Sequence, residues 1–212
     1  MKKIKYIIII AIIFIITGCN RYSLDKIISS VKNFYNGYYN IEYISSYKKN
    51  DTTYVIMSAN DTVFYVKSAY DGNAAGGLGN TDIETSILSS LYLKYKSQIE
   101  LLAKKNNLNI IFNDYSMEDI FLYNNYTIEI NTNISNIDNV KKFCEEVIEI
   151  EEINKIYNLV YGDGSYSYYE LEMIGMNNSI IKIYDNENMI KSFSIFDEKF
   201  QNETLKINKK TY

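Results

Sequence analysis

The sequence predicts an α+β domain with a mainly antiparallel sheet and two long helices. Of the 212 residues, 47% are hydrophobic and 23% are charged, which is the balance of a folded domain. Several β-rich runs are joined by short polar turns, which favours antiparallel pairing. Two longer segments repeat apolar residues every three or four positions, as amphipathic helices do. Because no proline-, glycine- or serine-rich linker divides the chain, we expect one domain over residues 24–196, followed by a polar tail at 197–212.

The first elements are a short helix and a meander. Residues 24–36 predict a helix with Ser23 as its cap, since apolar residues recur on one face. Three strands are then expected at 41–47, 52–59 and 62–70. The polar segments between them, 48–51 and Asn60 with Asp61, suit tight hairpins because Asn and Asp tolerate left-handed backbone conformations.

The middle of the chain predicts one long helix and two strands. Thr81 and Glu84 have the spacing of a capping box, and apolar residues from Ile83 onward continue at helical spacing to about residue 106. Residues 108–112 predict a buried strand. The alternation of apolar and polar residues over 126–131 predicts a strand with one face in water.

The last part of the domain repeats the order of the first. A second long helix is expected from about residue 136 to 160, followed by strands at 165–174, 179–184 and 189–196. The sequence therefore suggests two helix-plus-meander units, one at each end of the domain.

The amino-acid composition excludes several classes of catalytic and metal-binding site. The chain has no histidine, tryptophan or proline, which excludes histidine general bases, histidine metal ligands and Ser-His-Asp triads. A formal charge of −4 argues against nucleic-acid binding by bulk charge. No cofactor is expected. Cys144 lies in the second helical pattern beside Glu145 and Glu146, and it is expected to be a buried, unreactive side chain.

The N-terminus has the layout of an export signal. Lys2, Lys3 and Lys5 precede an apolar run of 11 residues over 6–16, which is too short to span a bilayer and suits a secretory signal peptide. The run ends in Ile16, Thr17, Gly18 and Cys19. These four residues resemble the lipobox of bacterial lipoproteins.

The resemblance implies that Cys19 receives a diacylglyceryl group, that a signal peptidase removes residues 1–18, and that the new amino terminus is acylated, for example by palmitate. Residues 19–23 are then the lipidated anchor and a short tether. The mature chain has 19 basic and 26 acidic residues, a net charge of −7. We expect an acidic domain on the exported face of the cell membrane or outer membrane, standing away from anionic headgroups.

The glycine-rich segment 71–82 has three interpretations. A phosphate site is disfavoured because no lysine follows the glycines. A weak calcium site would use Asp71, Asn73 and Asp82, which resemble positions one, three and twelve of an EF-hand loop. The favoured interpretation is a connector from sheet to helix, whose acidic residues cap the helix.

Tyrosine is unusually frequent, with 22 copies. One group, Tyr161, Tyr166, Tyr168 and Tyr169, suggests an aromatic binding surface, and adjacent Tyr168 and Tyr169 on a strand would point to opposite faces. A skewed composition, together with the preference of tyrosine for strands, explains the same residues without a binding role.

Taken together, the residues favour a lipid-anchored, non-enzymatic cell-envelope lipoprotein. Its exported domain would bind an unknown protein or glycan partner, and Cys19 would join it to the membrane. The alternative is a tethered hydrolase that acts on cell wall or glycans through carboxylates, for which the glutamates of 145–152 are candidates, although such a run is usually a solvated helix face.

Overall fold

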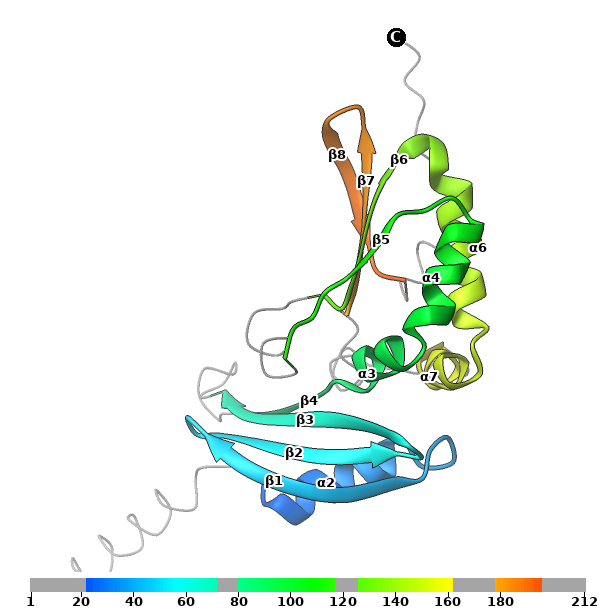
Figure 1. The fold of residues 1–212 in the computed structure, drawn as a ribbon. Helices are drawn as coiled ribbons and strands as arrows, with labels where there is room; N and C mark the ends of the chain where they lie inside the picture. Colours follow the sequence, from blue (N-terminus) through cyan, green and yellow to red (C-terminus); the bar gives the residue numbers. More distant parts are fainter. Residues whose placement is uncertain (1–21, 72–79, 117–125, 162–177, 196–212) are drawn as a thin grey trace, which may run out of the picture.

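The computed structural model describes residues 22–71, 80–116, 126–161 and 178–195. Two four-stranded sheets and the helices that pack on them form an α+β fold, which confirms the predicted class (Figure 1). We call the first sheet, order β1-β2-β3-β4, sheet A, and the second, order β5-β6-β7-β8, sheet B.

Sheet A is the predicted meander with one more strand. Its strands are antiparallel throughout, and they are β1 (Ile41–Lys49), β2 (Thr52–Ala59), β3 (Thr62–Asp71) and β4 (Asn80–Thr85). Asn50, Asp51 and Asn60 adopt φ values of 47°, 62° and 54°. The expected left-handed turn residues are therefore confirmed, and they set the register of the two hairpins.

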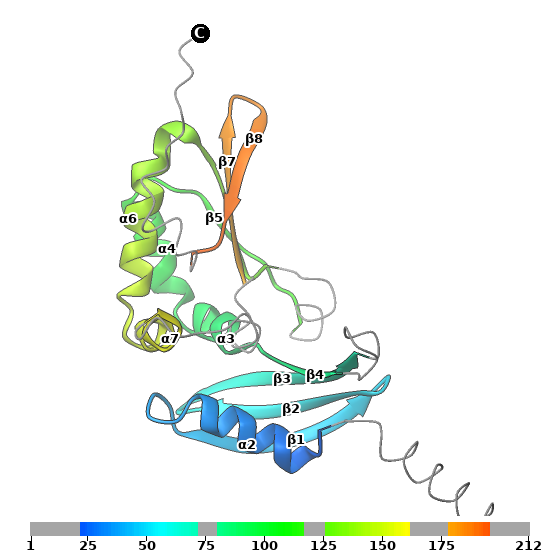
Figure 2. The same ribbon diagram turned by 180° about the vertical axis from the view of Figure 1, so that it is seen from behind.

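Helix α2 (Leu24–Phe34) covers one face of sheet A (Figure 2). The Ser23 hydroxyl accepts a hydrogen bond from the Lys26 backbone N–H at 3.3 Å, which confirms the predicted cap. Tyr35 follows the helix, is fully buried, and packs edge-on against Phe64 of β3 with 6.2 Å between ring centroids. Its hydroxyl lies 2.8 Å from that of Thr85 in β4, which ties the end of α2 to the sheet.

The predicted capping box at Thr81 and Glu84 is wrong. These residues belong to strand β4, where Ile83 lies opposite Ser68 and Glu84 opposite Lys67. Ile83 and Thr85 alternate with partly exposed neighbours, and the Lys67 ammonium contacts the Glu84 carboxylate at 2.9 Å. The position of Ile83 fits both the helical and the alternating pattern of apolar residues. The segment forms a strand because it pairs with the edge of β3 that β2 leaves open. The segment before it therefore joins two strands, so the expected connector from sheet to helix is also wrong.

Each predicted long helix is two helices. The first is α3 (Ile87–Lys94) and α4 (Lys96–Lys105), and the second is α6 (Ile137–Ile148) and α7 (Glu151–Tyr161), preceded by the 3₁₀ turn η1 (Ile134–Asn136). The first break falls at Tyr95, with φ −98° and ψ 17°. Helix α4 packs on α6 and α3 packs on α7. The breaks let one half of each segment cover sheet B while the other half lies between the sheets (Figures 1 and 2).

Sheet B is mixed rather than wholly antiparallel. Its strands are β5 (Ile110–Phe112), β6 (Ile128–Asn133), β7 (Ser179–Asp185) and β8 (Asn188–Phe193), and β6 and β7 are parallel. The chain between them contains α6 and α7, the kind of long helical crossover that parallel neighbours need. Of the three strands predicted for the second helix-plus-meander unit, the last two form the β7–β8 hairpin. The first, 165–174, lies outside the described residues.

The expected burial of residues 108–112 is only partly correct. Leu108 is buried, but Ile111 is 45% exposed because β5 is an edge strand whose second face has no described cover. The opposite face of sheet B packs on α4 and α6. There Ile128, Ile130, Ile181 and Ile183 contribute to a core continuous with that of sheet A. Cys144 of α6 is fully buried in this core, as predicted.

Candidate functional site

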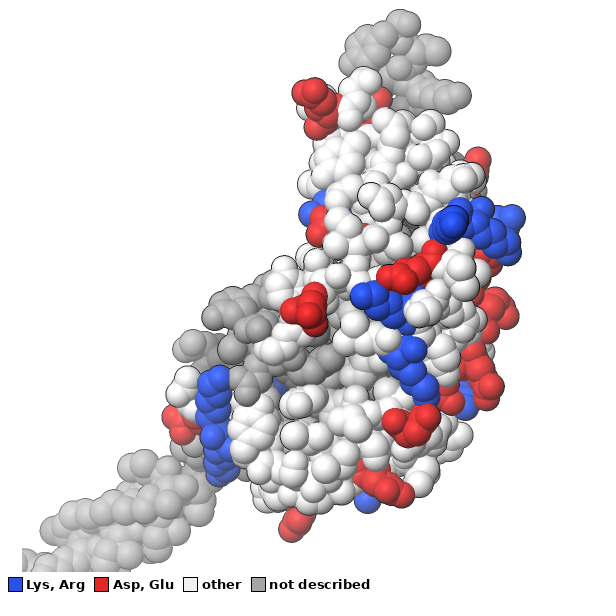
Figure 3. Space-filling view, viewed as in Figure 1, with Lys and Arg blue, Asp and Glu red and all other residues white. Residues whose placement is uncertain are grey.

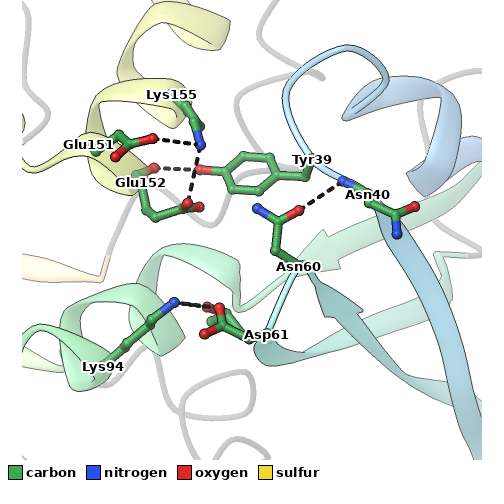
Figure 4. A network of polar contacts seen from close by, with 9 residues as sticks. Tyr39, Asn40, Asn60, Asp61, Lys94, Glu151, Glu152 and Lys155 are labelled. Carbon is green, nitrogen blue, oxygen red and sulfur yellow. Dashed lines mark hydrogen bonds and ion pairs between the residues drawn. The ribbon is translucent and has the colours of Figure 1, made fainter.

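A network of polar contacts joins sheet A to helices α3 and α7, and we call it the polar junction (Figure 4). It begins at Tyr39, which lies between α2 and β1 and is 7% exposed. The Tyr39 hydroxyl donates a hydrogen bond to the backbone carbonyl of Glu152 in the first turn of α7. Its ring packs edge-on against Tyr35, with 6.1 Å between centroids. The contact therefore links the core of sheet A directly to α7.

Lys155 of α7 completes this side of the junction. Its ammonium lies 3.1 Å from the carboxylate of Glu152 and 3.3 Å from that of Glu151. It also lies 5.9 Å from the centre of the Tyr39 ring, within range of a cation–π contact. The hydrogen bond to Glu152 raises the pKa of Lys155, so the ammonium stays charged at neutral pH.

The second side of the junction joins α3 to the turn between β2 and β3. The Lys94 ammonium contacts the Asp61 carboxylate at 2.5 Å and the Thr62 hydroxyl at 3.2 Å. This ion pair raises the pKa of Lys94 and lowers that of Asp61. The same turn is held to the start of β1, because the Asn60 side chain accepts a hydrogen bond from the Asn40 backbone N–H at 3.2 Å.

The chemistry of the polar junction suits holding elements together. Burial, and then the nearby Glu152 carboxylate, raise the pKa of Tyr39, so its phenol stays protonated at neutral pH. Burial likewise raises the pKa of Tyr35 and Tyr92. The junction thus presents a protonated phenol, charge-paired lysines and the Glu152 carboxylate, whose second oxygen is buried without a hydrogen-bond partner among the described residues.

The face of sheet B turned away from α4 and α6 is a second candidate site, and we call it the open face. Across it the Lys182 ammonium contacts the Glu129 carboxylate at 2.7 Å, and the Asn131 amide donates to Glu129 at 3.2 Å. The lysine hydrogen bond lowers the pKa of Glu129. Exposed Ile111 lies on this face opposite Glu129. Charged, amide and apolar groups are therefore side by side on a sheet that no described helix covers here.

The β7–β8 hairpin extends the exposed surface of sheet B. Met189 is 56% exposed and Ile190 is 42% exposed, and β8 is the outer strand of the sheet. Among the described strands none pairs with this edge of β8, and an edge that combines backbone groups with apolar side chains is what strand-addition partners use.

The sequence-predicted site residues lie mostly outside the described part of the chain. This holds for Ile16, Thr17, Gly18 and Cys19, for Tyr166, Tyr168 and Tyr169, and for Asn73. Tyr161 is the last residue of α7, and its side chain is not described. These predictions therefore stay predictions.

Two of the suggested calcium ligands lie on strands. Asp71 ends β3 opposite Asn80, and Asp82 lies two residues into β4 opposite Ala69. Within residues 22–71, 80–116, 126–161 and 178–195, no three His, Cys, Asp or Glu side chains gather as a metal site would require. The calcium interpretation stays a prediction, because Asn73 and the side chain of Asp71 lie outside what the structure describes.

The glutamates of residues 145–152 are not all a solvated face. Glu146 accepts hydrogen bonds from Lys105 at 2.6 Å and from the Asn106 amide at 2.7 Å, which joins α6 to the end of α4. The Lys105 contact lowers the pKa of Glu146. Glu152 belongs to the polar junction. Two of these carboxylates thus hold helices in place.

The polar junction was not predicted from the sequence. The spacing of Glu151 and Glu152 from Lys155 is a local signal for ion pairs on a helix. Tyr39 and Glu152 are 113 positions apart, and no pattern in the sequence joins them.

Comparison of the chain with protein-family models, curated proteins and solved structures gives no significant match. Among the helices that the structure describes, none has both the length and the apolar character needed to cross a bilayer.

Proposed function

We propose that this chain is a lipid-anchored lipoprotein of the bacterial cell envelope, and that its exported domain binds another protein or an envelope component without catalysing a reaction. One observation carries the proposal. Lys2, Lys3 and Lys5 precede a short apolar run, and Cys19 follows Ile16, Thr17 and Gly18. Acylation of Cys19 and of its amino group would anchor the chain stably, because two or more chains are needed for lasting attachment.

The described ionisable groups support a binding role. A glycosidase-type hydrolase needs two carboxylates that converge on one substrate. Glu151 and Glu152 lie close together, but both contact Lys155 of their own helix. Elsewhere Glu129 pairs with Lys182, Glu146 with Lys105, and Asp61 with Lys94. These carboxylates are held ionised by lysines and stabilise the fold, whereas a general acid would need a raised pKa.

The open face of sheet B is the surface that we propose for the partner. It combines the Glu129–Lys182 pair with exposed Ile111, and it continues into Met189 and Ile190 on the outer hairpin. Mixed polar and apolar surfaces of this kind are typical of transient protein contacts.

The anchor is tested by labelling cells with radioactive palmitate. We expect the wild-type chain to carry the label and to fractionate with membranes, and Cys19→Ser to lose both properties. Cys144→Ser is the matched control, because it removes the only other cysteine without touching the signal. Equal labelling of wild type and Cys19→Ser would refute the lipid anchor.

The binding role is tested by affinity capture from detergent-solubilised envelope, with mass-spectrometric identification of what is retained. We expect the wild-type bait to retain one partner and the charge reversal Lys182→Glu to release it. Lys104→Glu, on α4 away from the open face, should retain the partner. A bait with Tyr168→Ala and Tyr169→Ala tests the predicted tyrosine surface.

If the wild-type bait retains no partner, the alternative function, a tethered hydrolase, should be tested next. In that case purified cell wall incubated with the protein should release soluble fragments. Release of soluble fragments, together with no captured partner, would refute the binding role.

A further inference from the structure

We propose that one end of sheet A rests on the surface of the membrane that holds the anchor. This end consists of the start of α2 and the outer strand β1 with the β1–β2 turn, and its exposed residues are Leu24, Tyr43, Ile44, Lys48 and Lys49. We call it the membrane-facing end. The proposal rests on the lipidation of Cys19 proposed above, and it adds which surface of the domain the lipid brings to the bilayer.

The length of the tether is the first argument. Tyr22 already belongs to the folded domain, because its ring packs against the core and lies 3.9 Å below the Lys26 ammonium. Only three residue steps separate Tyr22 from Cys19. An extended chain covers at most about 10 Å in three steps, so the start of α2 cannot move farther than that from the lipid headgroups.

The position of β1 is the second argument. Both views show that α2 begins at the end of sheet A where β1 runs into β2 (Figures 1 and 2). Strand β1 is the outer strand of the sheet, and no strand in the described part of the chain pairs with its second edge. A tether of about 10 Å therefore brings the Lys49 end of β1 close to the bilayer. Ile44 lies five residues earlier, about 17 Å along the strand, so it reaches the bilayer if β1 lies along the membrane surface, and this orientation is part of the proposal.

The exposed side chains at this end suit a lipid–water interface. Leu24 is 36% exposed, Tyr43 is 43% exposed and Ile44 is 50% exposed. Ile44 lies at a register shift between Tyr43 and Ser45, where β1 carries one more residue than β2 and the ladder is interrupted. Aromatic and aliphatic side chains are stabilised at the headgroup boundary, where their apolar surface leaves water.

Charge favours the same orientation. Lys26, Lys48 and Lys49 are all exposed, and basic side chains are visible at this end of sheet A in Figure 3. Asp25 and Asp51 offset part of this charge, so the end is close to neutral. Helix α6 lies far from β1 (Figure 1), and it carries Asp138, Glu145 and Glu146 against Lys141 and Lys142, a net charge of −1. An anionic surface therefore repels the far side of the molecule more than this end. The sequence predicted that the whole domain stands away from the headgroups, whereas we propose that this end contacts them.

The test uses the full lipidated protein reconstituted into vesicles of phosphatidylcholine and phosphatidylglycerol. Ile44→Cys places a reactive thiol on β1, and Met189→Cys places the matched control on the β7–β8 hairpin, since Cys144 is buried. An environment-sensitive fluorophore is attached to each thiol. We expect a blue-shifted emission and weaker quenching by aqueous iodide at position 44 in vesicles than in detergent, and no change at position 189.

A charge variant gives an independent measurement. Lys48→Glu with Lys49→Glu should lower the equilibrium constant between shielded and exposed label at position 44, by about fivefold for each lysine lost near an anionic surface. Lys141→Glu with Lys142→Glu on α6 is the control and should leave the shielding unchanged. Equal quenching at positions 44 and 189 in protein that floats with the vesicles would overturn the orientation alone. Protein that does not float would overturn the lipid anchor, and the orientation with it.

Discussion

Replacement of Tyr39 by Phe tests whether the polar junction couples sheet A to α7. The substitution removes one hydroxyl and keeps the ring, which still packs on Tyr35 and still faces Lys155. The Glu152 carbonyl loses the Tyr39 donor. Because that carbonyl belongs to a helix and also accepts a bond from the following turn, it is not left wholly unpaired.

The expected cost is therefore that of one partly buried hydrogen bond. Such a bond contributes about 1 kcal/mol net to the free energy of unfolding. Tyr39→Ala removes the ring as well, and because Tyr39 is only 7% exposed, we expect a loss of roughly 3–5 kcal/mol, as for other buried aromatic side chains.

The assay is urea unfolding followed by far-ultraviolet circular dichroism on a chain that begins at residue 20. Tyr38→Phe is the matched control, because Tyr38 is the adjacent residue and is 38% exposed. We expect it to change the free energy of unfolding by less than about 0.5 kcal/mol. If Tyr39→Phe and Tyr38→Phe lower the free energy of unfolding by the same amount, the Tyr39–Glu152 contact does not stabilise the fold. The polar junction then does not couple sheet A to α7.

Three further measurements follow from burial. First, the three tyrosines whose pKa is raised by burial hold their protons more tightly when folded, so stability should be complete below pH 10. Above that pH the free energy of unfolding should fall by up to about 1.4 kcal/mol per pH unit for each group, and a free energy of unfolding that stays constant there would contradict this. Second, Leu91→Ala, at a fully buried position, should cost about 2–5 kcal/mol in urea unfolding, whereas Leu101→Ala, 67% exposed, should cost less than about 0.5 kcal/mol. Third, burial raises the pKa of the Cys144 thiol, so in Cys19→Ser a thiol reagent at pH 8 should modify Cys144 only after denaturant is added.

Local patterns in the sequence predicted the elements whose hydrogen bonds are local. Ser23 caps α2, and Asn50, Asp51 and Asn60 take the positive φ values that the hairpins of sheet A need. Each of these features depends on a few neighbouring residues, so it can be recognised from spacing and residue type alone. The export segment is equally local, and it remains the main basis for the proposed function.

Patterns that fit two structures were decided by tertiary contacts. Ile83 suits a helix or a strand, and the free edge of β3 selects the strand. The two long helical patterns are continuous in sequence, yet each is broken so that α4 and α6 cover sheet B while α3 and α7 meet sheet A. The spacing of apolar residues shows only which face of a helix is buried. It does not show where a helix ends so that its two halves can pack on different sheets.

The sequence by itself determined the α+β class, the first meander, its turns, the burial of Cys144 and the absence of histidine chemistry. Only the tertiary structure decided the parallel pairing of β6 with β7, the exposure of Ile111, and the meeting of Tyr39 with Glu152. The physical reason is the range of the interactions. Caps, turns and apolar faces arise within one or two turns of backbone, whereas strand partners and polar contacts between layers join residues that are up to 113 positions apart.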